Sequence, residues 1–142
     1  MRLPLVSLVV LAALSLTAIA PGARSRVKTI SAKLTAAAVA PKSTSTAIGA
    51  VSVTLDAKAG RACWKISVKT RIKPFSAHIH RGAPGKNGPV VIPLGDIWKP
   101  NGCVVAPTKS IAAVAATPKG YYVDVHSPKH IDGLVRGQLH AG

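Results

Sequence analysis

The sequence predicts an all-β fold, a Greek-key β-sandwich or barrel with one short helix and a single disulfide, behind an N-terminal leader. Short runs of alternating apolar and polar residues recur along the chain, and turn-forming residues separate them about every ten residues. Only one stretch has helical spacing. Many short strands in this arrangement are typical of antiparallel sandwiches and barrels.

The leader is expected to be a secretory signal peptide over residues 1–25, followed by one domain over residues 26–142. Met1-Arg2 precedes an apolar run from Leu3 to Ala20, and small residues around Ala20 allow cleavage between 20 and 25. A membrane anchor is the alternative, because a run of about 18 apolar residues is the lower limit for crossing a bilayer. Cleavage would place the domain outside the cell or in the cell envelope, with no integral membrane segment.

The first half of the domain predicts an extended stretch and a β-hairpin. Ile30 to Val39 reads as extended, ending at Pro41. Ile48 to Leu55 and Ala62 to Val68 both alternate, and the turn at Asp56–Gly60 joins them. One face of this hairpin is apolar and is expected to be buried; it carries Val51, Val53, Leu55, Trp64, Ile66 and Val68.

The second half predicts four more strands and the helix. The strands are Phe75–His80, Val90–Leu94, Tyr121–His126 and Leu134–His140. The helix is expected over Thr108–Thr117, with Thr108 as its N-cap and Pro118 and Gly120 ending it.

The charge of the chain is strongly positive, with a formal net charge of +15. Loss of Arg2 and Arg24 with the leader leaves 17 basic residues against four Asp, a net charge of +13. Such a domain attracts anionic polymers of a cell envelope. Sequence-specific nucleic-acid binding is not indicated, because the basic residues are spread along the chain and few aromatic residues are available for base stacking.

The two cysteines, Cys63 and Cys103, are expected to form a disulfide, as paired cysteines in exported domains usually do. A two-cysteine metal site is the alternative, although neither cysteine lies in a CxxC motif. The disulfide would close a loop of about 40 residues and stabilise the fold by about 4 kcal/mol in the chain-entropy model.

Three histidines form a candidate metal site. His78 and His80 lie two apart on a predicted strand and therefore project from the same face, and His126 ends a strand suited to pair nearby. Three imidazoles would suit zinc or copper. The alternative is structural: histidines at strand ends bond to loop carbonyls, here those of the Gly82–Gly88 loop.

Hydrolytic chemistry has little support. The glycines of the Gly82–Gly88 loop lack the Gly-Lys-Ser/Thr of a phosphate-binding loop. Asp124 is expected to pair with a lysine or with Arg136, which leaves no paired carboxylates. Ser127, His126 and Asp124 are adjacent in sequence but lack a nucleophile elbow.

Several segments together resemble the chordin domain (CHRD) family from about residue 30 to the end. The segments are GAVSVTLD from Gly49, SAHIHRG from Ser76, GKNGPVVIPL from Gly85, GCV from Gly102, GYYVDVH from Gly120 and RGQL from Arg136. The chain departs from the family at Ala38–Pro41, where the family commonly has Glu-Val-Pro-Pro, and at Ser127–Gly133, where it often has an aromatic-proline pair. The resemblance implies a secreted domain, and together with the net charge of +13 and the shortage of catalytic carboxylates it favours a non-enzymatic binding module whose partner is an anionic envelope polymer or an extracellular protein.

A fainter resemblance is to copper/zinc superoxide dismutase. It rests on the order of His78, His80, His126, the two cysteines and Arg136. The bridging and zinc-binding histidines of that family have no counterpart, since residues 81–125 contain no histidine. The resemblance implies, as an alternative function, a copper- or zinc-binding dismutase-like protein.

Overall fold

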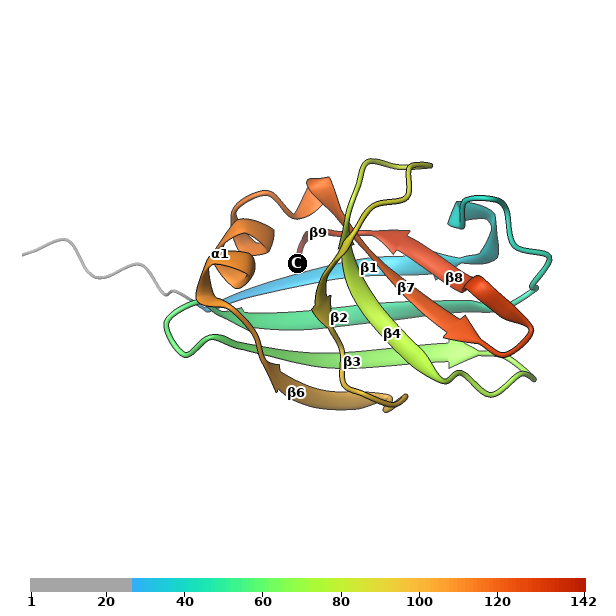
Figure 1. Ribbon diagram of the computed structural model, residues 1–142, viewed down its shortest axis with the longest axis horizontal. Helices are drawn as coiled ribbons and strands as arrows, with labels where there is room; N and C mark the ends of the chain where they lie inside the picture. The colour runs from blue at the N-terminus through green and yellow to red at the C-terminus, as the bar shows by residue number, and fades with distance from the viewer. Residues whose placement is uncertain (1–26) are drawn as a thin grey trace, which may run out of the picture.

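A computed structural model describes residues 27–142, so the expected signal peptide lies outside the described residues. Nine strands, one α-helix and two 3₁₀ helices make up this part of the chain (Figure 1). The strands are β1 (Val27–Thr35), β2 (Ile48–Asp56), β3 (Arg61–Lys69), β4 (Ser76–Arg81), β5 (Val90–Pro93), β6 (Asn101–Val105), β7 (Tyr121–Ser127), β8 (His130–Gln138) and β9 (His140–Ala141). The helices are α1 (Thr108–Ala116), η1 (Ala36–Ala38) and η2 (Pro118–Gly120). Within the described residues no helix has the length and apolar character needed to cross a membrane.

The strands form one antiparallel sheet in the order β5-β4-β7-β8-β1-β2-β3-β6, with β9 paired to β1. Strands β1 and β8 share only the pair Thr35 and Arg136, so the sheet folds there into two halves. We call β5-β4-β7-β8 the histidine half-sheet and β1-β2-β3-β6 the disulfide half-sheet. Neighbours that are distant in sequence, such as β4 with β7 and β3 with β6, require long connections of the Greek-key kind. The predicted fold class is therefore confirmed.

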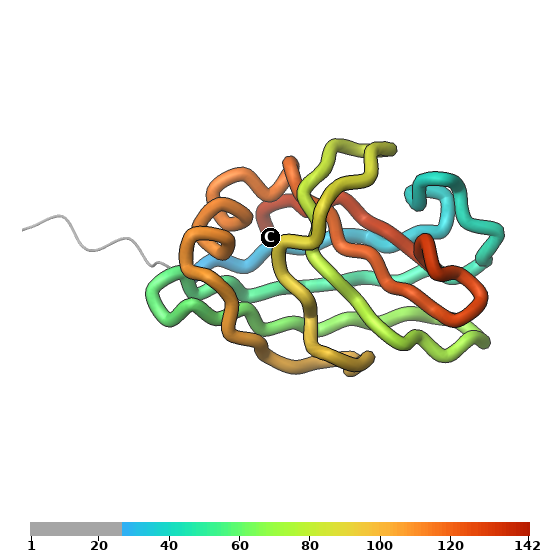
Figure 2. Tube along the Cα trace, in the orientation of Figure 1, coloured from blue at the N-terminus to red at the C-terminus, as the bar shows by residue number. Residues whose placement is uncertain are grey.

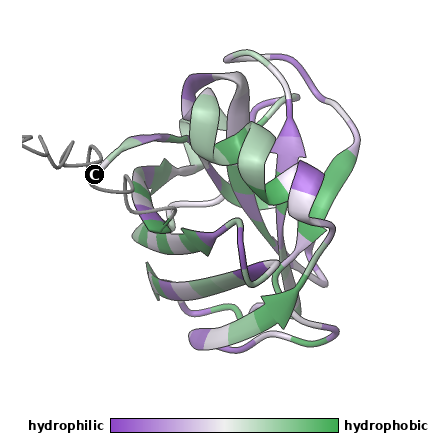
Figure 3. Ribbon diagram, turned by 90° about the vertical axis from the view of Figure 1, so that its left-hand side faces the viewer, coloured by the Kyte–Doolittle hydropathy of each residue, from purple (hydrophilic) through white to green (hydrophobic). Residues whose placement is uncertain are grey.

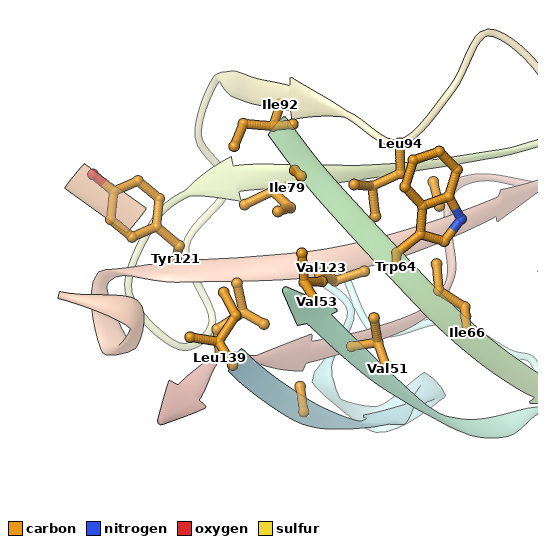
Figure 4. Packing of buried hydrophobic residues seen from close by; sticks show 14 of the residues in the cluster. Val51, Val53, Trp64, Ile66, Ile79, Ile92, Leu94, Tyr121, Val123 and Leu139 are labelled. Atoms are coloured by element: carbon orange, nitrogen blue, oxygen red, sulfur yellow. The ribbon is translucent and has the colours of Figure 1, made fainter. Parts of the chain in front are cut away.

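The core lies between the two half-sheets, because the apolar residue at every second position of each strand points inward. Apolar and polar residues alternate as bands along the strands in Figure 3. Figure 4 shows Val53 and Trp64 of the disulfide half-sheet packed towards Ile79 and Val123 of the histidine half-sheet. As predicted for the hairpin, Val51, Val53, Leu55, Trp64 and Ile66 are buried, and Val68 is partly buried.

The segment between β5 and β6 joins the half-sheets on their open side. Leu94 N–H donates to the Ala77 carbonyl of β4 at 2.9 Å. Ile66 N–H of β3 donates to the Pro100 carbonyl at 2.7 Å. The Trp64 indole donates to the Lys99 carbonyl at 3.0 Å, so this segment bonds to both halves of the fold.

Cys63 and Cys103 form the predicted disulfide. They are directly opposite each other on β3 and β6, on the face that points away from the core. The bond ties edge strand β6 to its neighbour.

Other element predictions need correction. The extended stretch ends at Thr35, because Ala36–Ala38 turn into η1. Strand β6 was not predicted, since its five residues have too little alternation to stand out. The helix covers Thr108–Ala116, but Pro107 rather than Thr108 occupies the N-cap position, and no side chain caps it.

Candidate metal centre

His78 and His80 project from the outer face of β4. The residues between and beside them, Ala77 and Ile79, are buried in the core. Period-two alternation therefore sends both imidazoles to the other side of the histidine half-sheet, as the sequence predicts.

Strand β7 brings two more side chains to this face. His78 is paired with Asp124, and Ser76 with His126, in antiparallel register. Cross-strand partners have Cβ atoms about 4.5–5.5 Å apart, close enough for their side chains to meet. Val123 and Val125, which flank Asp124, are buried in the core.

Four ligand atoms converge on one point. Asp124 Oδ1 lies 3.0 Å from His126 Nε2, 3.1 Å from His80 Nε2 and 3.7 Å from His78 Nδ1. All four atoms lie within 4.8 Å of one another. The Asp124 side chain is 7% exposed, His80 and His126 are each 12% exposed, and His78 is 25% exposed. The set is almost closed from solvent, with His78 on its open side.

Asp124 is the member of the group that the sequence prediction assigned wrongly. It was expected to pair with a lysine or with Arg136, whereas its carboxylate lies among three histidines. The signal for it was present: Asp124-Val125-His126 has the same two-residue spacing as His78-Ile79-His80. Two such pairs on neighbouring strands place four donor atoms on one face.

The outward-facing nitrogens of two rings identify their tautomers. His80 Nδ1 lies 2.8 Å from the Gly88 carbonyl, and His126 Nδ1 lies 2.7 Å from the Ile131 carbonyl. A carbonyl oxygen only accepts, so each Nδ1 carries the proton and the neutral ring presents a lone pair at Nε2. Loop-carbonyl bonding and convergence on a centre, predicted as alternatives, thus occur together.

The four converging atoms lack ordinary partners. Although they are close to one another, His78 Nδ1, His80 Nε2, His126 Nε2 and Asp124 Oδ1 are buried and make no contact with hydrogen-bond geometry among residues 27–142. Lone pairs that face a carboxylate oxygen repel it unless a cation lies between them. A buried set of this kind is stable only with protons on the rings or with a metal ion among them.

The electrostatics agree with that requirement. Burial alone would raise the pKa of Asp124, but its contacts with His126, His78 and His80 hold that pKa well below the usual range. Burial alone would lower the pKa of His80, yet the Asp124 carboxylate and the Gly88 carbonyl raise it. The pKa of His126 is raised against burial by Asp124 and by the Ile131 carbonyl. The site therefore attracts positive charge.

Arg136 of β8 is the cross-strand partner of Asp124, but among residues 27–142 its guanidinium forms no ion pair with that carboxylate. Its guanidinium stacks 3.3 Å above the Tyr122 ring and donates to the Ala83 and Lys86 carbonyls and to Asn87 Oδ1. The Tyr122 ring in turn stacks on His80, with centroids 4.9 Å apart and planes 8° from parallel. Arg136 is 2% exposed, and burial lowers its pKa.

The Gly82–Gly88 loop is held by these contacts. Gly88 N–H donates to the Tyr122 hydroxyl at 3.2 Å, and Gln138 Nε2 donates to the Gly82 carbonyl at 2.8 Å. A Cβ at Gly88 would collide with the Arg81 carbonyl, so glycine is required where the loop folds back. The loop thereby presents the Gly88 carbonyl to His80.

The remaining histidines lie elsewhere. His130 Nδ1 is 3.2 Å from Ser127 Oγ, and His140 Nδ1 is 3.5 Å from Ser31 Oγ. Among residues 27–142, Asp124 and the three histidines around it are the one group of three or more His, Cys, Asp or Glu that could hold a metal.

Comparison with known families gives one match. The model of the CHRD domain matches residues 30–139, which is most of the chain. No curated protein and no solved structure matches it significantly.

Proposed function

This chain belongs to the CHRD domain family, whose members are extracellular modules, and we propose that it is an extracellular metal-binding domain. It holds one zinc or copper ion between His78, His80, Asp124 and His126. The disulfide agrees with an oxidising compartment. The observation that carries the proposal is the convergence of four buried nitrogen and oxygen atoms that have no hydrogen-bond partner outside their own group.

The donor set favours these metals. Three imidazoles and one carboxylate suit zinc or copper, whereas calcium and magnesium prefer oxygen ligands alone. In a tetrahedral site with bonds of about 2 Å, ligand atoms lie about 3.3 Å apart. The three distances from Asp124 Oδ1, 3.0, 3.1 and 3.7 Å, are close to that value.

Bonds from the outer nitrogens support the same assignment. Histidines that ligate metals usually donate their other ring N–H to a carbonyl or carboxylate, which fixes the tautomer and the ring orientation. His80 and His126 both do so, through Gly88 and Ile131. The rings are therefore preorganised with Nε2 directed at the centre.

Metal analysis tests this proposal. Purified protein, stripped with a chelator and then dialysed against zinc or copper, should retain one ion per chain. A His80→Ala variant should retain much less, and a His140→Ala variant, which removes an exposed histidine outside the cluster, should match the wild type. Equal, substoichiometric metal in the wild type and His80→Ala would eliminate the site.

A dismutase-like activity is the second candidate, favoured by the convergence of His78, His80 and His126 that the fainter resemblance anticipates. Copper in this set would be approached from the side of His78, its most exposed ligand. Copper-loaded protein should accelerate superoxide decay and lose that activity in His80→Ala. Absence of activity in copper-loaded wild type would leave a binding domain only.

A further inference from the structure

The outer face of the disulfide half-sheet differs in character from the metal centre. Most of its outward positions carry small, hydroxyl-bearing or basic side chains, at least partly exposed, and exposed apolar residues lie at strand ends: Val27 of β1, Ile48 of β2 and Val105 of β6. The small, hydroxyl-bearing and basic residues are Thr29, Ser31, Lys33 and Thr35 of β1, Ala50, Ser52 and Thr54 of β2, and Arg61, Lys65, Ser67 and Lys69 of β3.

This face is hollowed where its side chains are smallest. One depression of about 450 Å³ lies beside Lys65 and Asn101, and another of about 730 Å³ lies beside Lys33 and Lys69. Both are floored by Ala50 and Ser67, which are cross-strand partners. The two depressions therefore adjoin along β2 and β3.

A third hollow extends them past the end of the sheet. It has a volume of about 820 Å³ and shares Ile48 and Lys69 with the second depression. Its walls are the segments 44–48 and 69–72, with His130. Figure 2 shows the loops before β2, after β3 and between β7 and β8 gathered at this end, away from α1. We call the three hollows together the basic trough.

The charges along the basic trough are of one sign. Lys33, Lys65, Lys69 and Arg71 line it, and no acidic residue does. Asp124 lies among the three histidines of the candidate metal centre, which we call the histidine cluster. Asp56 accepts hydrogen bonds from the N–H groups of Lys58 and Ala59 in the β2–β3 turn. None of the ion pairs found among residues 27–142 involves these four cations, which are therefore available to an external anion.

We propose that the basic trough binds an acidic polysaccharide. Lys65 and Lys69 lie four residues apart on one face of β3, about 13 Å, so a chain with repeated anionic groups can meet both. Hydroxyls of Thr44, Ser45 and Thr46 suit the polar groups of a sugar chain. No phenylalanine, tyrosine or tryptophan lines the basic trough, and its one aromatic ring, that of His130, is half-buried, so successive bases of a nucleic acid have no stacking platform there. This activity is independent of the metal centre, which lies on the other half-sheet.

Titration of purified protein with defined polymers tests the proposal. Polygalacturonate supplies carboxylates, dextran sulfate supplies sulfates, and neutral dextran and single-stranded DNA serve as comparisons. Binding to one or both acidic polysaccharides that weakens with salt, with none to neutral dextran, is expected. Tighter binding of polygalacturonate would identify carboxylates as the preferred anionic groups, and tighter binding of dextran sulfate would identify sulfates.

Matched variants separate the basic trough from general charge attraction. Lys65→Gln/Lys69→Gln removes two exposed cations from the trough, and Lys109→Gln/Lys119→Gln removes two exposed cations from the region of α1 and η2. The first pair should weaken polysaccharide binding about tenfold and the second by much less. Circular dichroism and thermal melts should show both variants folded, since all four side chains are exposed. Equal weakening by both pairs, tighter binding to DNA than to either acidic polysaccharide, or no binding at low salt would overturn the proposal.

Discussion

Asp124 gives the histidine cluster its charge. Three neutral imidazoles alone could be buried together without a counter-charge, but a carboxylate 3.0–3.7 Å from each of their inner nitrogens requires a cation. In the metal-free protein, protons on the imidazole rings supply this positive charge. A divalent metal ion would supply more of it. At the scale of single residues, the account therefore depends on competition between protons and a metal for the same atoms.

Substitution of Asp124 tests its role as a ligand. Asp124→Asn keeps the side-chain shape but removes the charge, so zinc affinity should fall by more than about a hundredfold, the upper effect of losing an outer-shell partner. Calorimetric titration measures it. Asp96→Asn, at an exposed carboxylate outside the cluster, is the matched control and should bind as the wild type does. Unchanged affinity in Asp124→Asn would mean that the carboxylate is no ligand.

The pH dependence of zinc binding follows from the raised pKa values of His80 and His126. Protons hold both Nε2 atoms to a higher pH than in an exposed histidine, so zinc affinity should rise with pH through those pKa values and then level off. At pH values below both pKa values, zinc must displace two protons to bind. Zinc affinity should therefore fall by up to about a hundredfold for each unit by which the pH decreases.

The metal-free protein should show the opposite trend. A raised histidine pKa contributes stability that is fully present below the unfolded-state value, about 6.5, and is lost as pH rises through the folded-state value. The depressed pKa of Asp124 contributes stability that is lost only in stronger acid. The zinc-induced increase in Tm should therefore grow between about pH 5.5 and about pH 8. An increase that is the same across this range would contradict proton–metal competition.

At the scale of elements, the neighbouring strands β4, β7 and β8 each contribute side chains to the candidate metal centre. The first two strands carry the proposed ligands, and β8 contributes Arg136, which holds the Gly82–Gly88 loop and stacks on Tyr122. Since that loop supplies the carbonyl for His80, Arg136 is a positioning residue for the centre. It touches none of the ligand atoms in the contacts described above.

Arg136→Lys should reduce zinc affinity by about tenfold to a hundredfold without removing a ligand. A lysine ammonium cannot reach three acceptors in a fork and stack on Tyr122 at the same time. Nitrogen chemical shifts of the imidazoles should show whether His80 still carries its proton on Nδ1 in the variant. Arg81→Lys, at an exposed arginine, is the control. Retention of both the tautomer and wild-type affinity in Arg136→Lys would show that the loop is positioned without Arg136.

Much of this arrangement could be predicted from the sequence, because strand alternation determines which side chains share a face. His78, His80 and His126 were predicted on that ground, as was the buried side of the β2–β3 hairpin. Asp124 was assigned to a different partner, because carboxylates in basic proteins usually meet lysine or arginine and the register of β4 with β7 cannot be read from the chain. The roles of Tyr122, Asn87 and Gly88 depend on how a glycine-containing loop folds back over β7 and β8, and this is determined by tertiary contacts.

At the scale of the whole molecule, two outer faces with different chemistry share one apolar core. The histidine half-sheet carries the candidate metal centre, and the disulfide half-sheet carries the basic trough and the Cys63–Cys103 bond. The half-sheets meet at the β1–β8 residue pair, at β9, which pairs with β1, and at the segment between β5 and β6, while the outer face of each half-sheet is formed by its own strands.

Removal of the disulfide should lower the free energy of unfolding without changing the affinity for zinc. Cys63→Ser/Cys103→Ser should lower the free energy of unfolding by up to about 4 kcal/mol, since the bond closes a loop of 40 residues. Denaturant unfolding measures that loss. Zinc affinity of the folded variant should match the wild type, because the ligands lie on the other half-sheet. A loss of affinity comparable with that of Asp124→Asn would show that the two half-sheets are coupled.

The central claim is that one metal ion is bound by four named atoms. Anomalous diffraction at the zinc absorption edge, from crystals of zinc-loaded protein, tests it most directly. The account predicts one strong peak about 2 Å from His78 Nδ1, His80 Nε2, His126 Nε2 and Asp124 Oδ1. A peak confined to His130 or His140, or the absence of any peak from the cluster, would contradict it.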